Sequence, residues 1–364
     1  MAAQARRPAA RPEVRAAPRV ELCSDEVARD AVRLVVVDPA AGGAAPRLAA
    51  FAALPQLLRA GDLVVVNDAA TLPAALPGQT AAGEGFELRL SGPLDAGRLF
   101  GVLLGAGDHR TRTEHRAPPP VIAAGQRVTI AGLAATVAAA AGRRVELVVH
   151  GDGDALWQTL YARGAPVQYA HRPDLLPLWS VQTAYAARPW AAEMPSAGRP
   201  LTWDTVLGLR RAGIGVASLT HAAGLSSTGD DALDRALPWP ERYEISRRTV
   251  DAIGAARARG GRVIAIGTTV VRALEAAATV PDGNGGCDGA LHAGSGVATL
   301  RLDAHYRPRV VSGLVSGLHV PGESHFDLLS AFAPAERLRA VIALAAAHGL
   351  SSHELGDACL IIPA

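Results

Sequence analysis

Short apolar runs and amphipathic segments alternate along most of the chain and predict an α/β protein. The runs Leu34–Val37, Leu63–Val66 and Val263–Ile266 have the length and composition of buried strands. Segments with the apolar spacing of helices are found at Leu54–Leu58, Ala155–Arg163, Thr202–Ala212 and Arg247–Arg259. Strands and helices mixed in this way favour a layered α/β fold.

The pattern changes between Leu76 and His150, where short alternating runs are separated by glycine and proline. This spacing predicts a small antiparallel β-barrel or sandwich. The alanine-rich segment Leu133–Ala141 fits either a strand or a helix. The simplest organisation is a larger α/β domain with an inserted small antiparallel β-barrel domain. We expect a disordered tail at residues 1–19, the α/β domain at 20–75 and 151–364, and the barrel at 76–150.

Composition narrows the class of protein further. A chain of 364 residues with 49% apolar residues can bury a large core. Its net charge is only +2, which permits a local contact with nucleic acid but does not indicate one. The first twenty residues lack the apolar core of a secretory signal, and no apolar run has membrane-spanning length. We therefore expect a cytoplasmic protein with no membrane partner.

Cysteine spacing and the common motifs exclude several kinds of site. The three cysteines, Cys23, Cys287 and Cys359, are far apart and form no metal-binding or disulfide pattern, so we expect no metal. The chain has no phosphate loop, no dinucleotide-binding fingerprint, no H-E-x-x-H pair and no G-x-S-x-G elbow. Its chemistry must come from a less common arrangement.

The strand Val263–Ile266 and the segment after it form the most informative candidate site. Gly267 breaks the apolar run, and Thr268 and Thr269 then open an amphipathic helix that carries Arg272. A glycine turn into a helix start aims free backbone N–H groups at one point, which suits an anionic or strongly polar ligand. A threonine pair at a helix start is also a common cap, so this segment alone is a modest signal.

Further polar candidates stand at the ends of apolar runs, and each also has a structural explanation. They are Asn67 and Asp68, then Gln182, Thr183 and Tyr185, then Thr220 and His221, then Glu241, and finally His319. Asx turns, loop contacts and a structural histidine explain several of them equally well. Glu241 and Glu244 are three apart in an extended segment, so we expect them to face opposite sides. Ser324 and Asp327 have the spacing of an approximate capping box.

Taken in order, these segments resemble the S-adenosylmethionine:tRNA ribosyltransferase-isomerase family of queuosine biosynthesis. The resemblance runs through most of residues 30–364. It rests on GDLVVVNDAATLPAAL (Gly61–Leu76), SVQTAYA (Ser180–Ala186), GVASLTHAAG, ERYEISRRTVDAI (Glu241–Ile253), IAIGTTVVRALE, VSGLHVPGESHFDLLSAF and HELGDACLI (His353–Ile361).

The resemblance implies an α/β domain with an inserted β-barrel and the use of S-adenosylmethionine as co-substrate. The family transfers the ribosyl part of that molecule to a 7-aminomethyl-7-deazaguanine in a tRNA anticodon, forms an epoxycyclopentanediol and releases adenine and methionine. This chemistry needs a base near C5′, for which His221, Glu241 and Asp68 are candidates. We expect the co-substrate to contact Asn67, Gln182, Thr183, Tyr185, Thr220, Gly267, Thr268, Thr269, Arg272 and His319. The helix start with Arg272 is the candidate for the methionine carboxylate.

The chain also departs from the family pattern in several segments, among them SDEVARDAVR (Ser24–Arg33), the residues near Ser324 and two loops. AAEMPSAGRPLT (Ala191–Thr202) replaces an AAPTAGLHFT-like string, and HAAGLSSTG (His221–Gly229) replaces a VGAGTFRPV-like one. These departures leave two alternatives open. One is a divergent paralogue that uses S-adenosylmethionine on a small-molecule acceptor or cleaves it otherwise, and the other is a non-catalytic protein that binds it. The sequence does not indicate the oligomeric state.

Overall fold

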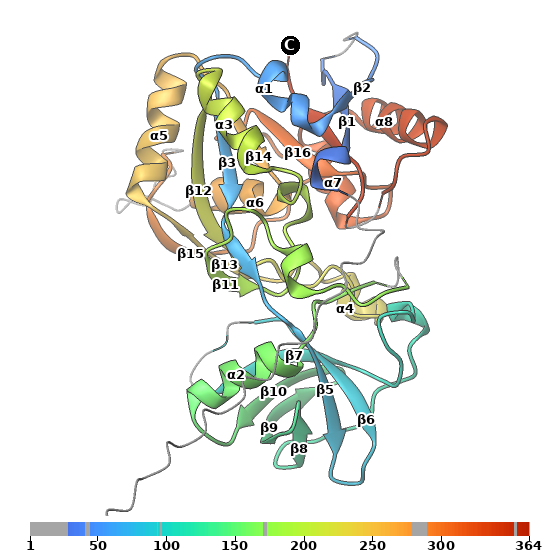
Figure 1. Ribbon diagram of the computed structural model, residues 1–364. Coiled ribbons are helices and arrows are strands. Elements are labelled where there is room, and N and C mark those ends of the chain that lie inside the picture. The colour runs from blue at the N-terminus through green and yellow to red at the C-terminus, as the bar shows by residue number, and fades with distance from the viewer. Residues whose placement is uncertain are drawn as a thin grey trace, which may run out of the picture.

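The computed structural model describes residues 28–40, 44–92, 94, 97–169, 173–278, 290–352 and 355–363 (Figure 1). The expected tail at residues 1–19 and the first residues of the expected α/β domain lie outside this part of the chain. So do His353 and Glu354 of the C-terminal motif, and the cysteines Cys23 and Cys287.

The described residues form strands and helices with the following bounds. The strands are β1 (Arg33–Val37), β2 (Arg47–Ala50), β3 (Leu63–Asn67), β4 (Ala69–Thr71), β5 (Ala75–Thr80), β6 (Gly85–Leu90), β7 (Arg98–Leu104), β8 (Arg127–Ile130), β9 (Leu133–Ala141), β10 (Arg144–Val149), β11 (Arg188–Ala191), β12 (Gly215–His221), β13 (Glu241–Ile245), β14 (Val263–Ile266), β15 (Gly294–Ala298), β16 (Gly313–Gly317) and β17 (Ala358–Ile361). The helices are α1 (Leu54–Leu57), α2 (Gly153–Arg163), α3 (Trp203–Arg211), α4 (Asp231–Asp234), α5 (Arg247–Ala258), α6 (Thr268–Ala277), α7 (Ser324–Ser330) and α8 (Ala335–Ala347).

A mixed sheet forms the larger body of the molecule. Within the described residues it has nine strands in the order β15-β13-β12-β3-β14-β16-β17-β1-β2. Its centre is parallel, because β3 pairs with both β12 and β14, and β14 pairs with β16. The neighbours β13 and β17 run antiparallel to this centre. The four parallel strands therefore end at the same edge of the sheet.

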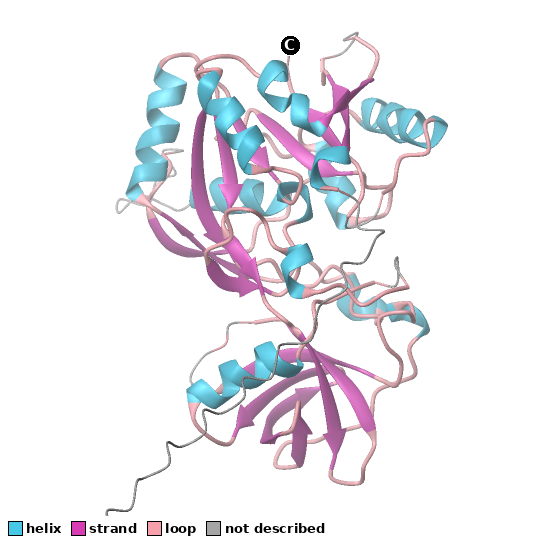
Figure 2. Ribbon diagram, viewed as in Figure 1, coloured by secondary structure: helices cyan, strands magenta, loops and turns pink. Residues whose placement is uncertain are grey.

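Helices cover both faces of this sheet, which explains why its central strands are uninterrupted apolar runs (Figure 2). On β3, Leu63 and Val65 point into the core formed with α5, α6, α7 and α8. Val64 and Val66 point into the opposite core, formed with α1 and α3. Full burial of one such side chain stabilises the fold by about 1.5–3 kcal/mol. Consecutive residues at the end of a strand therefore point to opposite faces of the sheet and face different helices.

A small closed barrel forms the second body, with the strand order β10-β7-β6-β5-β8-β9 among the described residues. Every pairing in it is antiparallel. The alanine-rich segment forms β9, in which Ala135 and Val137 face the barrel core. Alternate burial within the barrel outweighs the helix propensity of alanine at these positions. Helix α2 packs on the barrel through Leu156 and Leu160.

Loops of the larger body close one end of the barrel. Ala192, after β11, and Leu225, after β12, are buried in the barrel core together with Val167. Figure 1 shows these connections and α4 between the sheet above and the barrel below. The two bodies thus share a hydrophobic core.

The α/β fold with an inserted antiparallel barrel is confirmed. The predicted cap at Ser324 is wrong, because Ser324 is the first residue of α7 and Glu323 precedes it as the N-cap. The Glu323 carboxylate binds His319 Nδ1 and the backbone N–H of Val320, so no side chain caps α7 in the described structure. Among the residues described, no helix combines the length and apolarity needed to cross a bilayer.

Candidate functional site

The candidate residues lie where the parallel strands β3, β12, β14 and β16 end. Asn67 ends β3, His221 ends β12, and Gly267 follows the last residue of β14. His319 lies two residues beyond β16. Ligands of open α/β sheets bind outside the carboxyl ends of their strands. This edge of the sheet is therefore the candidate site.

Gly267 turns the chain from β14 into α6. Its φ of 96° lies in the region that favours glycine, and its N–H donates to the carbonyl of Val315 at 2.8 Å. No side chain caps α6 in the described structure. The first-turn amides of Thr268 and Thr269 have no acceptor within the helix and are available to a ligand. Ala197 lies next to the turn, because a Cβ added to Gly267 would be 3.7 Å from the Ala197 Cβ.

Arg272 is buried and faces Glu241. Its guanidinium forms an ion pair with Glu241 and donates to the carbonyls of Leu300, Trp239 and Ala298 at 3.1–3.3 Å. Burial, and then the charge of Arg301, lower the pKa of Arg272 to about 10. This position does not fit the expected contact with a substrate carboxylate, because the guanidinium is already committed to these internal partners.

His221 lies beside the same ion pair. Its Nε2 is 3.5 Å from Glu241 Oε2, while Glu241 Oε1 accepts a 2.5 Å hydrogen bond from the N–H of Gly224. The His221 ring is fully buried, and burial followed by the charge of Arg272 lowers its pKa to about 3. Neither ring nitrogen has a hydrogen-bond partner among the described residues. His221 is thus a neutral, buried imidazole that lies beside the Glu241–Arg272 pair.

Asn67 joins the ends of two strands to the start of α6. Its Oδ1 accepts from the backbone N–H of His221 at 2.9 Å, and its Nδ2 donates to the His221 carbonyl at 2.9 Å. A longer contact of 3.4 Å joins Nδ2 to Thr269 Oγ1. The buried amide therefore fixes the relative positions of β3, β12 and α6.

Asp68 points to the opposite face of the sheet from Asn67. Its carboxylate accepts hydrogen bonds from Ser218 Oγ at 2.9 Å and Thr220 Oγ1 at 2.6 Å. Ser218 and Thr220 flank Leu219 on β12, so their side chains point to the opposite face of the sheet from the Leu219 side chain, which packs in the core with α6. The three candidate bases are therefore divided: His221 and Glu241 lie on the α6 face, and Asp68 lies on the α3 face.

Tyr185 and Thr183 adjoin Asp68 and the Gly267 turn. The Tyr185 hydroxyl donates to the carbonyl of Gly198 at 3.2 Å. Burial, and then the charge of Asp68, raise the pKa of Tyr185 well above its ordinary value. The hydroxyl of Thr183 is buried and has no hydrogen-bond partner among the described residues. Thr183 is therefore a polar group available to a bound molecule.

Gln182 has a different position from its neighbours. Its side-chain amide accepts from the N–H of Thr71 at 2.9 Å and donates to the Thr71 carbonyl at 2.8 Å. These two bonds hold the loop against β4 and use both ends of the amide. Gln182 thus positions the segment that carries Thr183 and Tyr185.

Comparison with known proteins shows the family of this chain. Residues 17–361 match the family model described as "Queuosine biosynthesis protein". The chain belongs to this family. It is 35% identical to the S-adenosylmethionine:tRNA ribosyltransferase-isomerase of Anaeromyxobacter sp. (strain K), over 92% of this chain and 93% of the relative. It is 34% identical to the enzyme of that name from Thermosynechococcus vestitus, over 86% and 85% of the two chains.

A solved structure is also similar. The S-adenosylmethionine tRNA ribosyltransferase of Thermotoga maritima aligns with 92% of this chain and 93% of its own, at 21% identity and a TM-score of 0.48. The sequence relatives carry the name of an enzyme, so this member of the queuosine biosynthesis family belongs to an enzyme family.

In this family member, His319 lies at the rim of the same edge. Its Nδ1 is 3.1 Å from Glu323 Oε2, and its ring stacks on His325 with centroids 4.7 Å apart. Burial, and then the charge of His319, lower the pKa of His325 to about 3, and Arg272 contributes in the same direction. His319 and His325 therefore form a stacked pair at the start of α7.

The sequence did not single out Ser218, Gly198 or His325. Ser218 has a signal, since it stands two residues before Thr220 and so shares its face of a strand. A Cβ on Gly198 would meet the Tyr185 hydroxyl and Thr183, so only glycine fits beside them. His325 has no sequence signal, because its stacking on His319 depends on the path of the turn between them.

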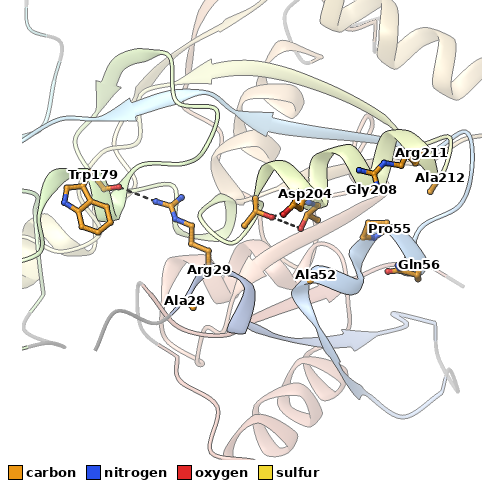
Figure 3. A pocket seen from close by; sticks show the side chains of 12 residues that line it. Ala28, Arg29, Ala52, Pro55, Gln56, Trp179, Asp204, Gly208, Arg211 and Ala212 are labelled. Atoms are coloured by element: carbon orange, nitrogen blue, oxygen red, sulfur yellow. Dashed lines mark hydrogen bonds between the residues drawn. The ribbon is translucent and has the colours of Figure 1, made fainter. Parts of the chain in front are cut away.

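A cavity of about 1060 Å³ lies elsewhere on this family member, between α1 and α3 (Figure 3). Arg29, Trp179, Asp204 and Arg211 are among the residues that line it. None of the candidate residues lines this cavity. The described residues also contain no group of three or more histidine, cysteine or acidic side chains arranged to hold a metal.

Proposed function

We propose that this protein transfers and isomerises the ribosyl part of S-adenosylmethionine onto 7-aminomethyl-7-deazaguanine in a tRNA anticodon. The products are an epoxyqueuosine residue, adenine and methionine. One observation carries the proposal: the segments that resemble the family converge on one edge of the sheet. At this edge lie the start of α6, which no side chain caps in the described structure, the Asp68 carboxylate, and the Thr183 hydroxyl, which has no hydrogen-bond partner among the described residues.

The arrangement suits the co-substrate on chemical grounds. The methionine carboxylate is an anion, and the first-turn amides of Thr268 and Thr269 form a site for an anion at the start of α6. The hydroxyl of Thr183 is available for a polar group of the ribose or adenine. We assign Gly267, Thr268, Thr269, Thr183 and Tyr185 to co-substrate binding.

Asp68 is the proposed base. A sulfonium acidifies the C5′ hydrogens beside it, and a carboxylate close to C5′ removes one of them. Asp68 is partly exposed on the α3 face, where Ser218 and Thr220 orient its carboxylate. His221 is fully buried next to Arg272, and Glu241 is paired with the same arginine. We assign His221, Glu241 and Arg272 to the support of the site, together with Asn67, Thr220 and Gln182.

The direct test incubates the purified protein with S-adenosylmethionine, with and without an anticodon stem-loop that bears 7-aminomethyl-7-deazaguanine. Release of adenine and methionine only with the RNA supports the proposal. Binding of S-adenosylmethionine without any cleavage would refute it and favour a non-catalytic binding protein.

Two variants test the assignment of the base in the same assay. Asp68→Asn removes the carboxylate and keeps its size, so we expect adenine release to fall by about 10²-fold or more. Ser218→Ala is the matched control, because it removes one hydrogen bond to Asp68 and leaves the carboxylate in place. Near-normal turnover in Asp68→Asn would refute the assignment.

A paralogue with a small-molecule acceptor is the second candidate. The observation that favours it is that two segments differ from the family pattern, and these segments meet through the hydrogen bond of Glu193 with Ser226. Cleavage of S-adenosylmethionine with a small amine and not with the stem-loop would decide for this alternative.

A further inference from the structure

The two loops in which this chain departs from the family pattern meet at the junction of the sheet and the barrel. Glu193 follows β11, and its carboxylate accepts hydrogen bonds from the N–H of Ser226 at 2.6 Å and from the Ser226 hydroxyl. Ser226 belongs to the loop after His221. The substitutions in the two segments are therefore physically coupled.

Tyr169 and Arg89 connect this pair to the barrel. The Tyr169 hydroxyl donates to Glu193 and also accepts from the N–H of Ser226 at 3.2 Å. The guanidinium of Arg89, on β6, lies over the Tyr169 ring at 5.1 Å. Arg89 is itself buried and held by Glu87, Thr113 and the carbonyl of Gln168. Glu193 thus lies between a fixed part of the barrel and the loop 222–229.

The loop 222–229 also connects the candidate site with the barrel. It begins next to His221, and the N–H of Gly224 donates to Glu241. Leu225 is buried in the barrel core, and the carbonyl of Thr228 accepts from Arg143 at 3.3 Å. Any displacement of Ser226 therefore changes the side of the site that faces the barrel. The turn at Gly267, which we assign to S-adenosylmethionine, adjoins Ala197.

We propose that Glu193 is a positioning residue for the acceptor. Through its hydrogen bonds with Ser226 and Tyr169 it holds the loop 222–229 in place, and this loop forms the side of the site against which the acceptor amine is placed. This inference rests on the proposed function. Burial raises the pKa of Glu193, and its three donors hold the carboxylate in one orientation. The role is one of geometry, since Glu193 acts through the loop.

The test separates the acceptor from the co-substrate. In Glu193→Gln we expect the KM for the modified stem-loop to rise on the order of tenfold, because misplacement of a binding wall weakens productive orientation. The KM for S-adenosylmethionine should stay within about twofold of the wild type, since its proposed contacts lie elsewhere. Hydrogen exchange at residues 222–229 should become faster.

Tyr169→Phe and Ser226→Ala keep the inference testable if Glu193→Gln folds poorly. Each removes one donor to the Glu193 carboxylate and should raise the acceptor KM by about threefold, while the KM for S-adenosylmethionine stays within about twofold of the wild type. The matched control is Glu146→Gln, which removes a barrel carboxylate paired with Arg98 and should change neither KM.

The outcomes distinguish this inference from the proposed function. A wild-type protein that is inactive on the stem-loop would refute the proposed function. An active wild type whose acceptor KM is unchanged in Glu193→Gln would refute the inference alone. A parallel rise of both KM values with a lower melting temperature would show a merely structural role and also refute it.

Discussion

At the scale of single residues, charged groups inside the molecule stabilise the frame around the site. Glu275 is the plainest case: it is fully buried on α6, and its carboxylate accepts from the Tyr306 hydroxyl and from the N–H groups of Arg309, Val310 and Val311. Four donors converge on one carboxylate. The loop before β16 is thereby fixed to the helix that starts at the candidate site.

Glu275→Ala should lower the free energy of unfolding by about 3 kcal/mol, because buried donors lose their partner and a cavity forms. Urea denaturation followed by circular dichroism measures this change. Asp251→Ala is the control, since Asp251 is exposed on α5 and forms an exposed ion pair with Arg247. This substitution should change stability by less than about 0.5 kcal/mol. Equal effects of the two substitutions would contradict the prediction.

The buried histidines predict a pH dependence of stability. Burial lowers the pKa of His221 and of His325 to about 3, below the value of about 6.5 for an exposed histidine. Between these values the unfolded chain binds more protons than the folded protein. The contribution of each histidine is therefore fully present above pH 6.5 and is lost as the pH falls towards 3.

We expect a slope of up to about 1.4 kcal/mol per pH unit from each histidine in this window. Unfolding free energies measured from pH 7 to pH 4 check the slope. His221→Gln should make the dependence shallower, whereas His305→Gln, at an exposed position, should leave it unchanged. An equal slope in His221→Gln would show that His221 is not a neutral buried group.

At the scale of elements, the turn from β14 into α6 decides whether the helix start faces a ligand. Gly267 has a φ of 96°, which costs a residue with a side chain about 1 kcal/mol or more. The space around it is sufficient, since the nearest atoms to an added Cβ are 3.6 and 3.7 Å away. Backbone strain should therefore determine the effect of Gly267→Ala, because the added methyl group has enough room.

Gly267→Ala should lower stability by about 1–2 kcal/mol and weaken the binding of S-adenosylmethionine, measured by calorimetry, because the first-turn amides of α6 move. Gly254→Ala is the matched control. Gly254 lies inside α5 with open space around its Cβ position, so alanine should stabilise the protein by up to about 1 kcal/mol. Unchanged ligand affinity in Gly267→Ala would separate this turn from the site.

At the scale of the whole molecule, the sheet and the barrel share a core. Leu225 and Ala192 come from loops of the sheet body and are buried among barrel residues. The Arg89–Tyr169–Glu193 contacts lie in the same junction. The barrel is thus a structural neighbour of the site.

Leu225→Ala should lower the stability of both bodies by about 2–4 kcal/mol, because it leaves a cavity in the shared core. Hydrogen exchange should then become faster in β6 of the barrel and in β12 of the sheet. Val145→Ala, inside the barrel on β10, should speed exchange in the barrel more than in β12. Faster exchange confined to the barrel in Leu225→Ala would contradict a shared core.

The pattern of apolar positions predicted β1, β3 and β14, the helices α1, α2, α3 and α5, and an α/β fold with a barrel, because local burial has a readable period. It also indicated the Gly267 turn, since glycine after a buried strand has a specific backbone meaning. The resemblance rested on ordered motifs that the sequence carries by itself.

Tertiary structure alone decided what those motifs face. Asn67 and Asp68 are neighbours in the chain but lie on opposite faces of the sheet, and Arg272 binds Glu241 in the interior. The contact of Glu193 with Ser226 spans segments that are distant in sequence. Such contacts depend on strand order and register, which bring distant residues together and leave no period in the chain.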